Sequence, residues 1–276
     1  MKEFTVIFTL LVLISCSSQR IDRKINDSSW DSLASETYLR WGENRLDKVT
    51  DSKQSVVNCY KGQTKETLEI FKKEYLVRKE DPNYWLHIGN CYFIEEKWVK
   101  AEFYYRLALE EAKIPAVKSI ALNNLGLISF KFEQWEKGKT FLNQSIALAP
   151  NFKVPRYNLS QLYLQFGLYD KAIDTLGHQV FRGHKDIDVH FSLANAYLYK
   201  GELEKSKMYF DSIPKEHLKR EDIAATYALY HIRIGNLKLA KEIMDDRNRS
   251  GVVELTAISH KIEKILSQRM IEEQKK

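Results

Sequence analysis

The sequence has little cysteine, proline or glycine, and each shortage excludes a class of protein. Among its 276 residues there are three cysteines, too few for a fold held together mainly by disulfides. Only 5 prolines and 11 glycines interrupt the chain, which leaves long stretches suited to helix. The hydrophobic share of 44% is that of an ordinary globular protein, so the chain is not disordered throughout.

An excess of charge of one sign is also missing. The net charge is +6 and there is no long basic run, so the composition does not indicate a protein that binds nucleic acid. A charge of this size suits contact with anionic lipid or with an acidic partner.

The motifs of common catalytic and cofactor sites are absent as well. The chain contains no Gly-x-Ser-x-Gly, His-Glu-x-x-His or Cys-x-x-Cys pattern. Gly138-Lys139-Thr140 resembles the end of a phosphate-binding loop, but Glu133 stands where that loop needs its first glycine. We therefore expect no catalytic residues, no cofactor and no small-molecule substrate.

Three histidines are the remaining candidates for a chemical site. His178, His184 and His190 are six residues apart, and this spacing does not put them on one face of a helix. We interpret them as solvated loop residues and expect no metal site. An enzyme with an unrecognised site at this junction is the remote alternative.

Residues 1–15 have the features of a lipoprotein signal peptide. An uncharged run of 11 residues, 4–14, is too short to span a bilayer and has the length of a signal-peptide core. It ends in Leu13-Ile14-Ser15-Cys16, which resembles the bacterial lipobox. The resemblance implies that the peptide is cut before Cys16 and that this cysteine is lipidated, with palmitate as one acyl chain. The alternative is an ordinary signal peptide with a chance cysteine.

The polar residues 16–29 are expected to form a flexible tether behind the lipid. Ser17 follows the cysteine, and by analogy with enterobacterial sorting this implies the periplasmic face of the outer membrane. The expected localisation is therefore the bacterial cell envelope, with the chain attached to the membrane through its lipid anchor.

The other two cysteines, Cys59 and Cys91, fall inside helical patterns. They could form a disulfide in an oxidising compartment, but small apolar residues in such patterns are more often buried free thiols. We therefore expect free thiols and leave the disulfide as the alternative.

The stretch from Trp85 to Ala108 indicates two helices packed face to face. Gly89 lies four residues after Trp85, and Ala101, Tyr105 and Ala108 follow at helical spacing. Small residues suit the places where two backbones touch, and large ones fill the gaps beside them. The pattern resembles one tetratricopeptide repeat (TPR), a unit of about 34 residues. The resemblance implies an all-α TPR solenoid, a right-handed superhelix of about six helix-turn-helix repeats.

The same pattern recurs over residues 48–250. We predict an N-terminal helix over 30–47, repeats near 48–81, 82–118, 119–152, 153–186, 187–220 and 221–250, and a C-terminal capping helix over 251–276. One slot at the end of each first helix holds Glu96 or Glu133 in two repeats and glycine in the other four, namely Gly62, Gly167, Gly201 and Gly235. A helix often ends there on a left-handed residue, which favours glycine.

The resemblance implies that the first helices of all repeats line a concave groove. We predict a partner-binding groove of aromatic, aliphatic and amide side chains: Leu86, Asn90, Phe93, Asn123, Leu127, Phe130, Tyr157, Gln161, Leu164, Phe191, Asn195 and Leu198. Amides can bond a peptide main chain, and apolar side chains can hold its side chains. For any single residue the alternative is packing between repeats.

A TPR that grips a C-terminal carboxylate is not expected. That kind of groove places lysine and arginine beside asparagine, whereas the corresponding slots here hold Leu86, Asn123 and Tyr157.

A lipobox, a tether and about six TPRs together resemble the outer-membrane pilotins of type IV pilus biogenesis (PilF/PilW/Tgl type). The resemblance implies a non-enzymatic scaffold that binds a peptide segment or helix of an envelope component such as a secretin and assists its assembly. The alternative is another envelope adaptor, either a scaffold for peptidoglycan hydrolases or a component of outer-membrane protein assembly.

Overall fold

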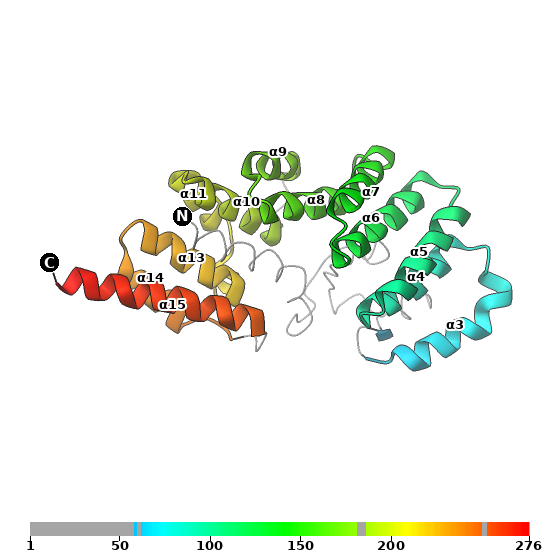
Figure 1. The fold of residues 1–276 in the computed structure, drawn as a ribbon, viewed down its shortest axis with the longest axis horizontal. Helices are drawn as coiled ribbons and strands as arrows, with labels where there is room; N and C mark the ends of the chain where they lie inside the picture. The colour runs from blue at the N-terminus through cyan, green and yellow to red at the C-terminus, as the bar shows by residue number, and fades with distance from the viewer. Residues whose placement is uncertain (1–57, 60–61, 181–185, 250–252, 276) are drawn as a thin grey trace. The chain divides into compact units, whose positions relative to one another are not determined.

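The structure, a computed structural model, describes residues 58–59, 62–180, 186–249 and 253–275 (Figure 1). The described part is all-α, and its helices are α3 (Thr64–Arg78), α4 (Pro82–Ile94), α5 (Trp98–Glu111), α6 (Pro115–Lys131), α7 (Trp135–Leu148), α8 (Lys153–Gln165), α9 (Tyr169–Val180), α10 (Ile187–Lys200), α11 (Leu203–Asp211), α12 (Lys215–Leu218), α13 (Glu221–Arg233), α14 (Leu237–Asp245) and α15 (Val253–Gln274). Cys16, the tether and the helix predicted over 30–47 lie outside the described residues.

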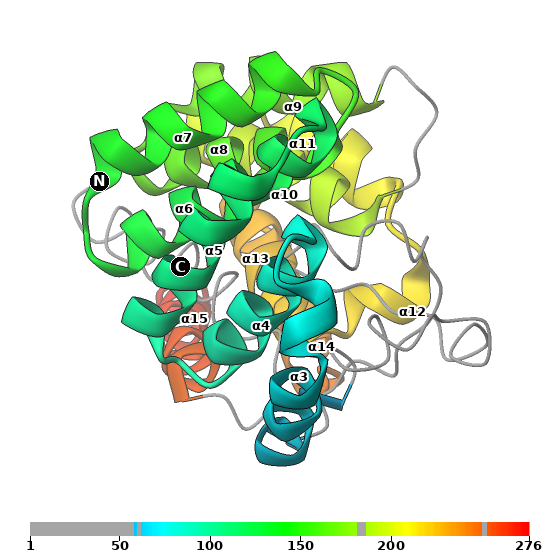
Figure 2. The same ribbon diagram turned by 90° about the vertical axis from the view of Figure 1, so that its right-hand side faces the viewer.

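The helices form the pairs of a TPR solenoid, as the sequence predicts. Helices α4 and α5, α6 and α7, α10 and α11, and α13 and α14 lie side by side in both views (Figures 1 and 2). Helix α4 begins at Pro82, where the Asp81 carboxylate accepts a hydrogen bond from the backbone N–H of Asn83 at 2.9 Å. Helix α6 begins at Pro115, four residues before the predicted 119–152 repeat, so the last residues of the 82–118 repeat extend this helix rather than a loop.

The chain divides into two compact units. The N-terminal unit comprises the described residues up to Leu159, and the C-terminal unit runs from Ser160 onward. The boundary falls inside α8.

Close contacts between the two helices of a repeat require small residues. A Cβ atom added to Gly89 would lie 2.5 Å from Cε1 of Tyr105, so the tyrosine ring occupies the place of a side chain at that position. In the next repeat a Cβ on Gly138 would lie 2.9 Å from the carbonyl oxygen of Gly126. In these two helix pairs, small residues therefore stand where the helices approach most closely, as the sequence pattern indicates.

The turn between the two helices of a repeat uses a left-handed residue. Gly201 has a φ of 88°, and the other three glycines of this slot also have positive φ. Glu96 and Glu133, which replace glycine there, adopt φ values of 60° and 58°. The backbone conformation of the turn is therefore kept even where the side chain makes it costly.

We predict different effects on stability for two substitutions at this turn position. Gly201→Ala should lower the free energy of unfolding by about 1–2 kcal/mol, because a Cβ is strained at this φ although no atom lies within 4 Å of it. Glu133→Gly should remove the same strain and lose no stability. Urea unfolding followed by circular dichroism checks both, and equal losses for the two variants would contradict the prediction.

A disulfide joins Cys59 to Cys91, so our expectation of free thiols is wrong. Their Cα atoms are 5.3 Å apart, and both side chains are buried in a hydrophobic cluster with Phe71 and Tyr84. The bond closes a loop with a sequence separation of 32, which stabilises the fold by about 3–4 kcal/mol in the chain-entropy account.

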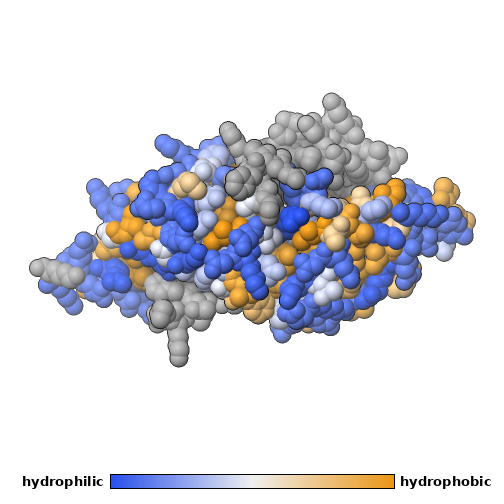
Figure 3. All heavy atoms as spheres, turned by 90° about the horizontal axis from the view of Figure 1, so that it is seen from above, coloured by the Kyte–Doolittle hydropathy of each residue, from blue (hydrophilic) through white to orange (hydrophobic). Residues whose placement is uncertain are grey.

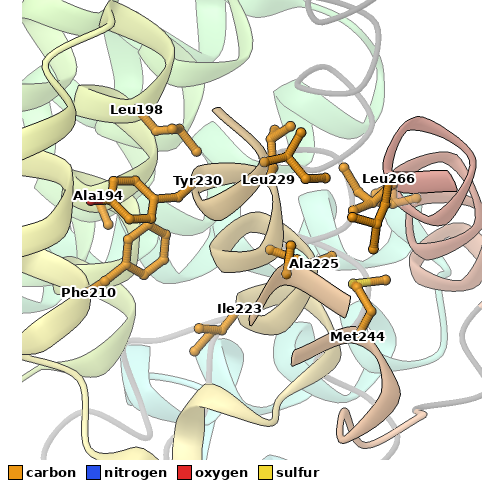
Figure 4. Close-up of a cluster of buried hydrophobic side chains, with 14 of the residues drawn as sticks. Ala194, Leu198, Phe210, Ile223, Ala225, Leu229, Tyr230, Met244 and Leu266 are labelled. Carbon is orange, nitrogen blue, oxygen red and sulfur yellow. The ribbon is translucent and has the colours of Figure 1, made fainter. Parts of the chain in front are cut away.

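Helix α15 closes the C-terminal end of the array. It contributes Leu255, Ile258, Ile262 and Leu266 to a core shared with α13 and α14. Figure 4 shows Leu266 of α15 within this cluster. Its buried Ser259 hydroxyl donates to Oε1 of Glu221 at 3.0 Å. A helix at the end of a solenoid needs one apolar face that packs on the last repeat and one polar face exposed to solvent.

Candidate binding groove

None of the twelve predicted groove residues is exposed. Phe93, Phe130 and Tyr157 are half-buried, and the other nine are buried. Several of them belong to the hydrophobic clusters of the two units, including Leu86 in the N-terminal unit and Leu198 in the C-terminal unit. The role of the twelve in binding stays a prediction, but their surroundings separate structural positions from candidates for binding.

Two of the aromatic residues pack inside their own repeats. The Phe93 ring meets the edge of Trp98 at a centroid distance of 4.8 Å. The Phe130 ring stacks on Trp135 at 5.9 Å and also occupies the space above Gly138. Both phenylalanines lie near the end of a first helix, where a long side chain can reach over the turn. They cover the tryptophan that begins the second helix.

The amides of the N-terminal unit are bonded to one another. The Tyr105 hydroxyl donates to Oδ1 of Asn90 at 2.8 Å, and Nδ2 of Asn124 donates to the same oxygen at 3.3 Å. Nδ2 of Asn123 donates to Oδ1 of Asn124 at 3.0 Å, and Nδ2 of Asn158 donates to Oδ1 of Asn123 at 2.8 Å. All four asparagines are buried, so this chain of hydrogen bonds links α4, α6 and α8 through the interior.

The partners that sequence reasoning missed share one position of the repeat. Asn124, Asn158, Ser192 and Thr226 follow one another at intervals of 34 residues, each at the sixth position of its repeat. All four are buried polar residues, which is unusual in a helix core unless they are hydrogen-bonded. The recurrence of polar residues every 34 positions was the sequence signal that could have identified these hydrogen-bond partners.

The sixth-position residue bonds a groove residue of the preceding repeat. Asn124 bonds Asn90 and Asn158 bonds Asn123 in the N-terminal unit, as described above. In the C-terminal unit Nε2 of Gln161 donates to the Ser192 hydroxyl at 2.8 Å. Three of the four predicted groove amides are therefore joined to the next repeat.

Asn195 is the exception among the four groove amides. The sixth position of the following repeat is Thr226, whose hydroxyl donates to the carbonyl oxygen of Asp222 at 3.0 Å, one turn back on its own helix. Oδ1 of Asn195 is buried and accepts no hydrogen bond within the described structure, although the residue is only 8% exposed. A buried acceptor without a donor costs about 1–3 kcal/mol.

The C-terminal unit also carries a partly buried ion cluster beside Phe191. Arg220 contacts Asp188 at 2.8 Å and Asp222 at 2.7 Å, and its guanidinium lies 5.8 Å from the centroid of the Phe191 ring. Burial alone would lower the pKa of Arg220, but the carboxylates of Asp222 and Asp188 outweigh it and raise the pKa. This arginine joins α10 to α13 and holds one side of Phe191.

The described residues contain no group of three or more His, Cys, Asp or Glu that could hold a metal ion. His190 lies in α10 with its ring 6.0 Å from that of Tyr209, and His184 is outside the described ranges. Gly138-Lys139-Thr140 lies within α7, where the Thr140 hydroxyl donates to the carbonyl oxygen of Glu136. This segment is helix rather than a loop that could surround a phosphate.

The outer surface is mixed in character. On the face seen in Figure 3, hydrophobic residues lie in patches separated by hydrophilic ones. Among the described helices, none is long and apolar enough to cross a bilayer.

Helix pairs, left-handed turns and polar links between repeats together define an α-solenoid of the TPR type. The chain is similar to the TPR repeat-containing protein YpiA of Bacillus subtilis, with 25% identity over 173 residues, or 61% of this chain. It spans 40% of the length of that relative. No protein-family model matches the sequence.

Solved structures share the same fold. PilF of Pseudomonas aeruginosa aligns with 79% of this chain and 98% of its own, with a TM-score of 0.63 and 14% identity. YrrB, described as a TPR protein with an unusual peptide-binding site, aligns with 70% of this chain and 97% of its own, with a TM-score of 0.51 and 16% identity. At such identities the likeness shows the fold alone, and TPR proteins are generally scaffolds rather than enzymes.

We predict that the two kinds of groove amide differ in their effect on stability. Asn124→Ala should lower the free energy of unfolding by about 1–3 kcal/mol, because it breaks the buried chain of hydrogen bonds at its centre. Asn195→Ala should lose less stability than Asn124→Ala, since its oxygen has no hydrogen bond to lose and its removal relieves the cost of an unpaired acceptor. Urea unfolding of both variants tests this, and a larger loss for Asn195→Ala would contradict it.

Proposed function

We propose that this protein is a non-enzymatic scaffold that binds an extended peptide segment of a protein partner through the first helices of its C-terminal unit. The observation that carries the proposal is the buried Oδ1 of Asn195, which lacks a hydrogen-bond donor. A main-chain N–H is a donor that every peptide residue except proline supplies.

The neighbours of Asn195 on the same helix support a peptide ligand. Phe191, one turn before it, is 6% exposed and is the apolar neighbour that a ligand would touch, because Leu198, one turn after it, is fully buried in the core. The guanidinium of Arg220 lies 5.8 Å from the centroid of the Phe191 ring. In the N-terminal unit the groove amides already bond to neighbouring repeats. A peptide would have to break those hydrogen bonds, so the C-terminal unit is the better site.

Peptides selected from a random library on the full chain provide the test. Asn195→Ala should weaken their binding roughly fivefold to tenfold, the value of one main-chain hydrogen bond. The matched control is Lys207→Ala on the exposed side of α11, which should leave the affinity unchanged. Titration calorimetry measures both. Equal affinity for the wild type and Asn195→Ala would contradict the proposed site.

We further propose that the scaffold is lipid-anchored at the outer membrane and assists assembly of a secretin or of type IV pili. The lipobox-like segment ending at Cys16 supports the anchor. The disulfide between Cys59 and Cys91 supports an oxidising compartment, since such bonds are rare in the cytosol. The fold shared with PilF is compatible with a role in pilus assembly, but a shared fold alone is not evidence for that role.

The anchor and the partner can be tested together in cells. Cys16→Ser should remove the acyl chains and lower the amount of secretin multimer in the outer membrane, because tethering raises the effective concentration of the scaffold. Quantitative immunoblots of membrane fractions measure multimer and monomer. Unchanged multimer would contradict the role in secretin assembly and favour another envelope adaptor.

A further inference from the structure

Helix α3 is held to the array by few noncovalent contacts. The Phe71 ring meets the edge of Tyr84 at 5.6 Å, and the Tyr84 hydroxyl donates to the Phe71 carbonyl oxygen at 2.7 Å. Arg78 at its end pairs with Asp81 at 2.9 Å. Phe71 is the large hydrophobic residue of α3 that is fully buried.

Thr64 and Thr67 of α3 are also buried and Leu68 packs against the same cluster, but most of the other side chains of the helix are exposed. Leu76 is 79% exposed and Val77 is 89% exposed, so these side chains contribute little to docking of the helix. A 15-residue helix is marginal on its own in water, and its stability depends on packing against a neighbour. Within the described residues, the apolar packing of α3 against α4 therefore centres on Phe71.

The disulfide supplies a covalent link at this end of the array. Cys59 lies just before α3, and Cys91 lies in α4, the first helix of the next repeat. Both cysteines are buried in the same cluster as Phe71 and Tyr84. The bond thus joins the first repeat to the second where the noncovalent contacts are concentrated.

We propose that docking of α3 onto α4 depends on oxidation of Cys59 and Cys91, so that this helix packs onto the array only where thiols are oxidised. The inference is independent of what the groove binds. It assigns to the disulfide the attachment of one repeat, while the C-terminal unit folds without it.

The oxidant is a disulfide-bearing compound or protein, and the chemistry is thiol–disulfide exchange. The thiolate of one cysteine attacks a sulfur of that disulfide, which forms a mixed disulfide and releases one thiolate. The thiolate of the second cysteine then attacks the chain's sulfur in the mixed disulfide and releases the other. Two protons leave the two thiols, and two electrons reduce the oxidant.

Burial sets the order of events. The exposed fractions of Cys59 and Cys91 are 1% and 0%, so neither sulfur can meet a second disulfide once α3 and α4 are packed. Exchange must precede packing, and the finished bond is shielded from reductants while the repeat stays folded. The disulfide therefore acts as a permanent link rather than as a reversible switch.

Hydrogen exchange on the full chain tests the proposal. One sample is kept oxidised, and the other is unfolded, reduced and refolded with reductant present. The two samples then differ in the oxidation state of Cys59 and Cys91. Amides of α3 should exchange about tenfold or more faster in the reduced sample, whereas amides of α15 in the C-terminal unit should be unchanged. Mass spectrometry of alkylated peptides verifies the state of each cysteine.

The double variant Cys59→Ala/Cys91→Ala should reproduce the reduced pattern in α3 without any reductant. Equal protection of α3 in the oxidised and reduced samples would overturn the proposal. Fast amide exchange of α3 in both samples would also overturn the proposal, because the disulfide would then not hold the helix in place. Loss of protection in α15 on reduction would show a global rather than a local role and would also refute it.

Discussion

The close approach of the two helices in each repeat is the constraint on which the rest of the structure depends. Tyr105 lies where a side chain on Gly89 would be, and the Phe130 ring occupies the corresponding place at Gly138. Such contacts allow no more than a small residue on one helix opposite a large one on the other. They fix which faces of the helices meet, and with that they fix which positions face the next repeat.

This constraint explains why the fold could be predicted from the sequence. Helix contacts repeat along the chain, so small and large residues recur at fixed intervals and can be recognised without a structure. The turn slot was predictable for the same reason, even at Glu133, where the residue type argues against a left-handed conformation. The geometry of the helix pair determines the turn, and the glutamate adopts it.

The candidate site was less predictable, because the position of a residue on a helix does not fix where a long side chain ends. Phe93 and Phe130 start on the groove side of the register, but their rings cover tryptophans at the turns. The disulfide was missed because it joins two repeats. A separation of 32 is close to one repeat length, and residues one repeat apart lie in neighbouring first helices. That comparison, rather than the helical pattern around each cysteine, was the useful signal.

Polar residues in the interior explain why one end of the array suits a ligand better than the other. Each buried amide needs a donor and an acceptor, and in a solenoid the next repeat is the nearest source of both. Asn124 and Asn158 meet this need in the N-terminal unit, which makes the groove amides there part of the links between repeats. The single hydroxyl hydrogen of Thr226 is donated to the carbonyl oxygen of Asp222 on its own helix, so it is not available to Oδ1 of Asn195. An incoming N–H at that residue replaces no existing hydrogen bond, and this is the physical reason to expect a peptide there.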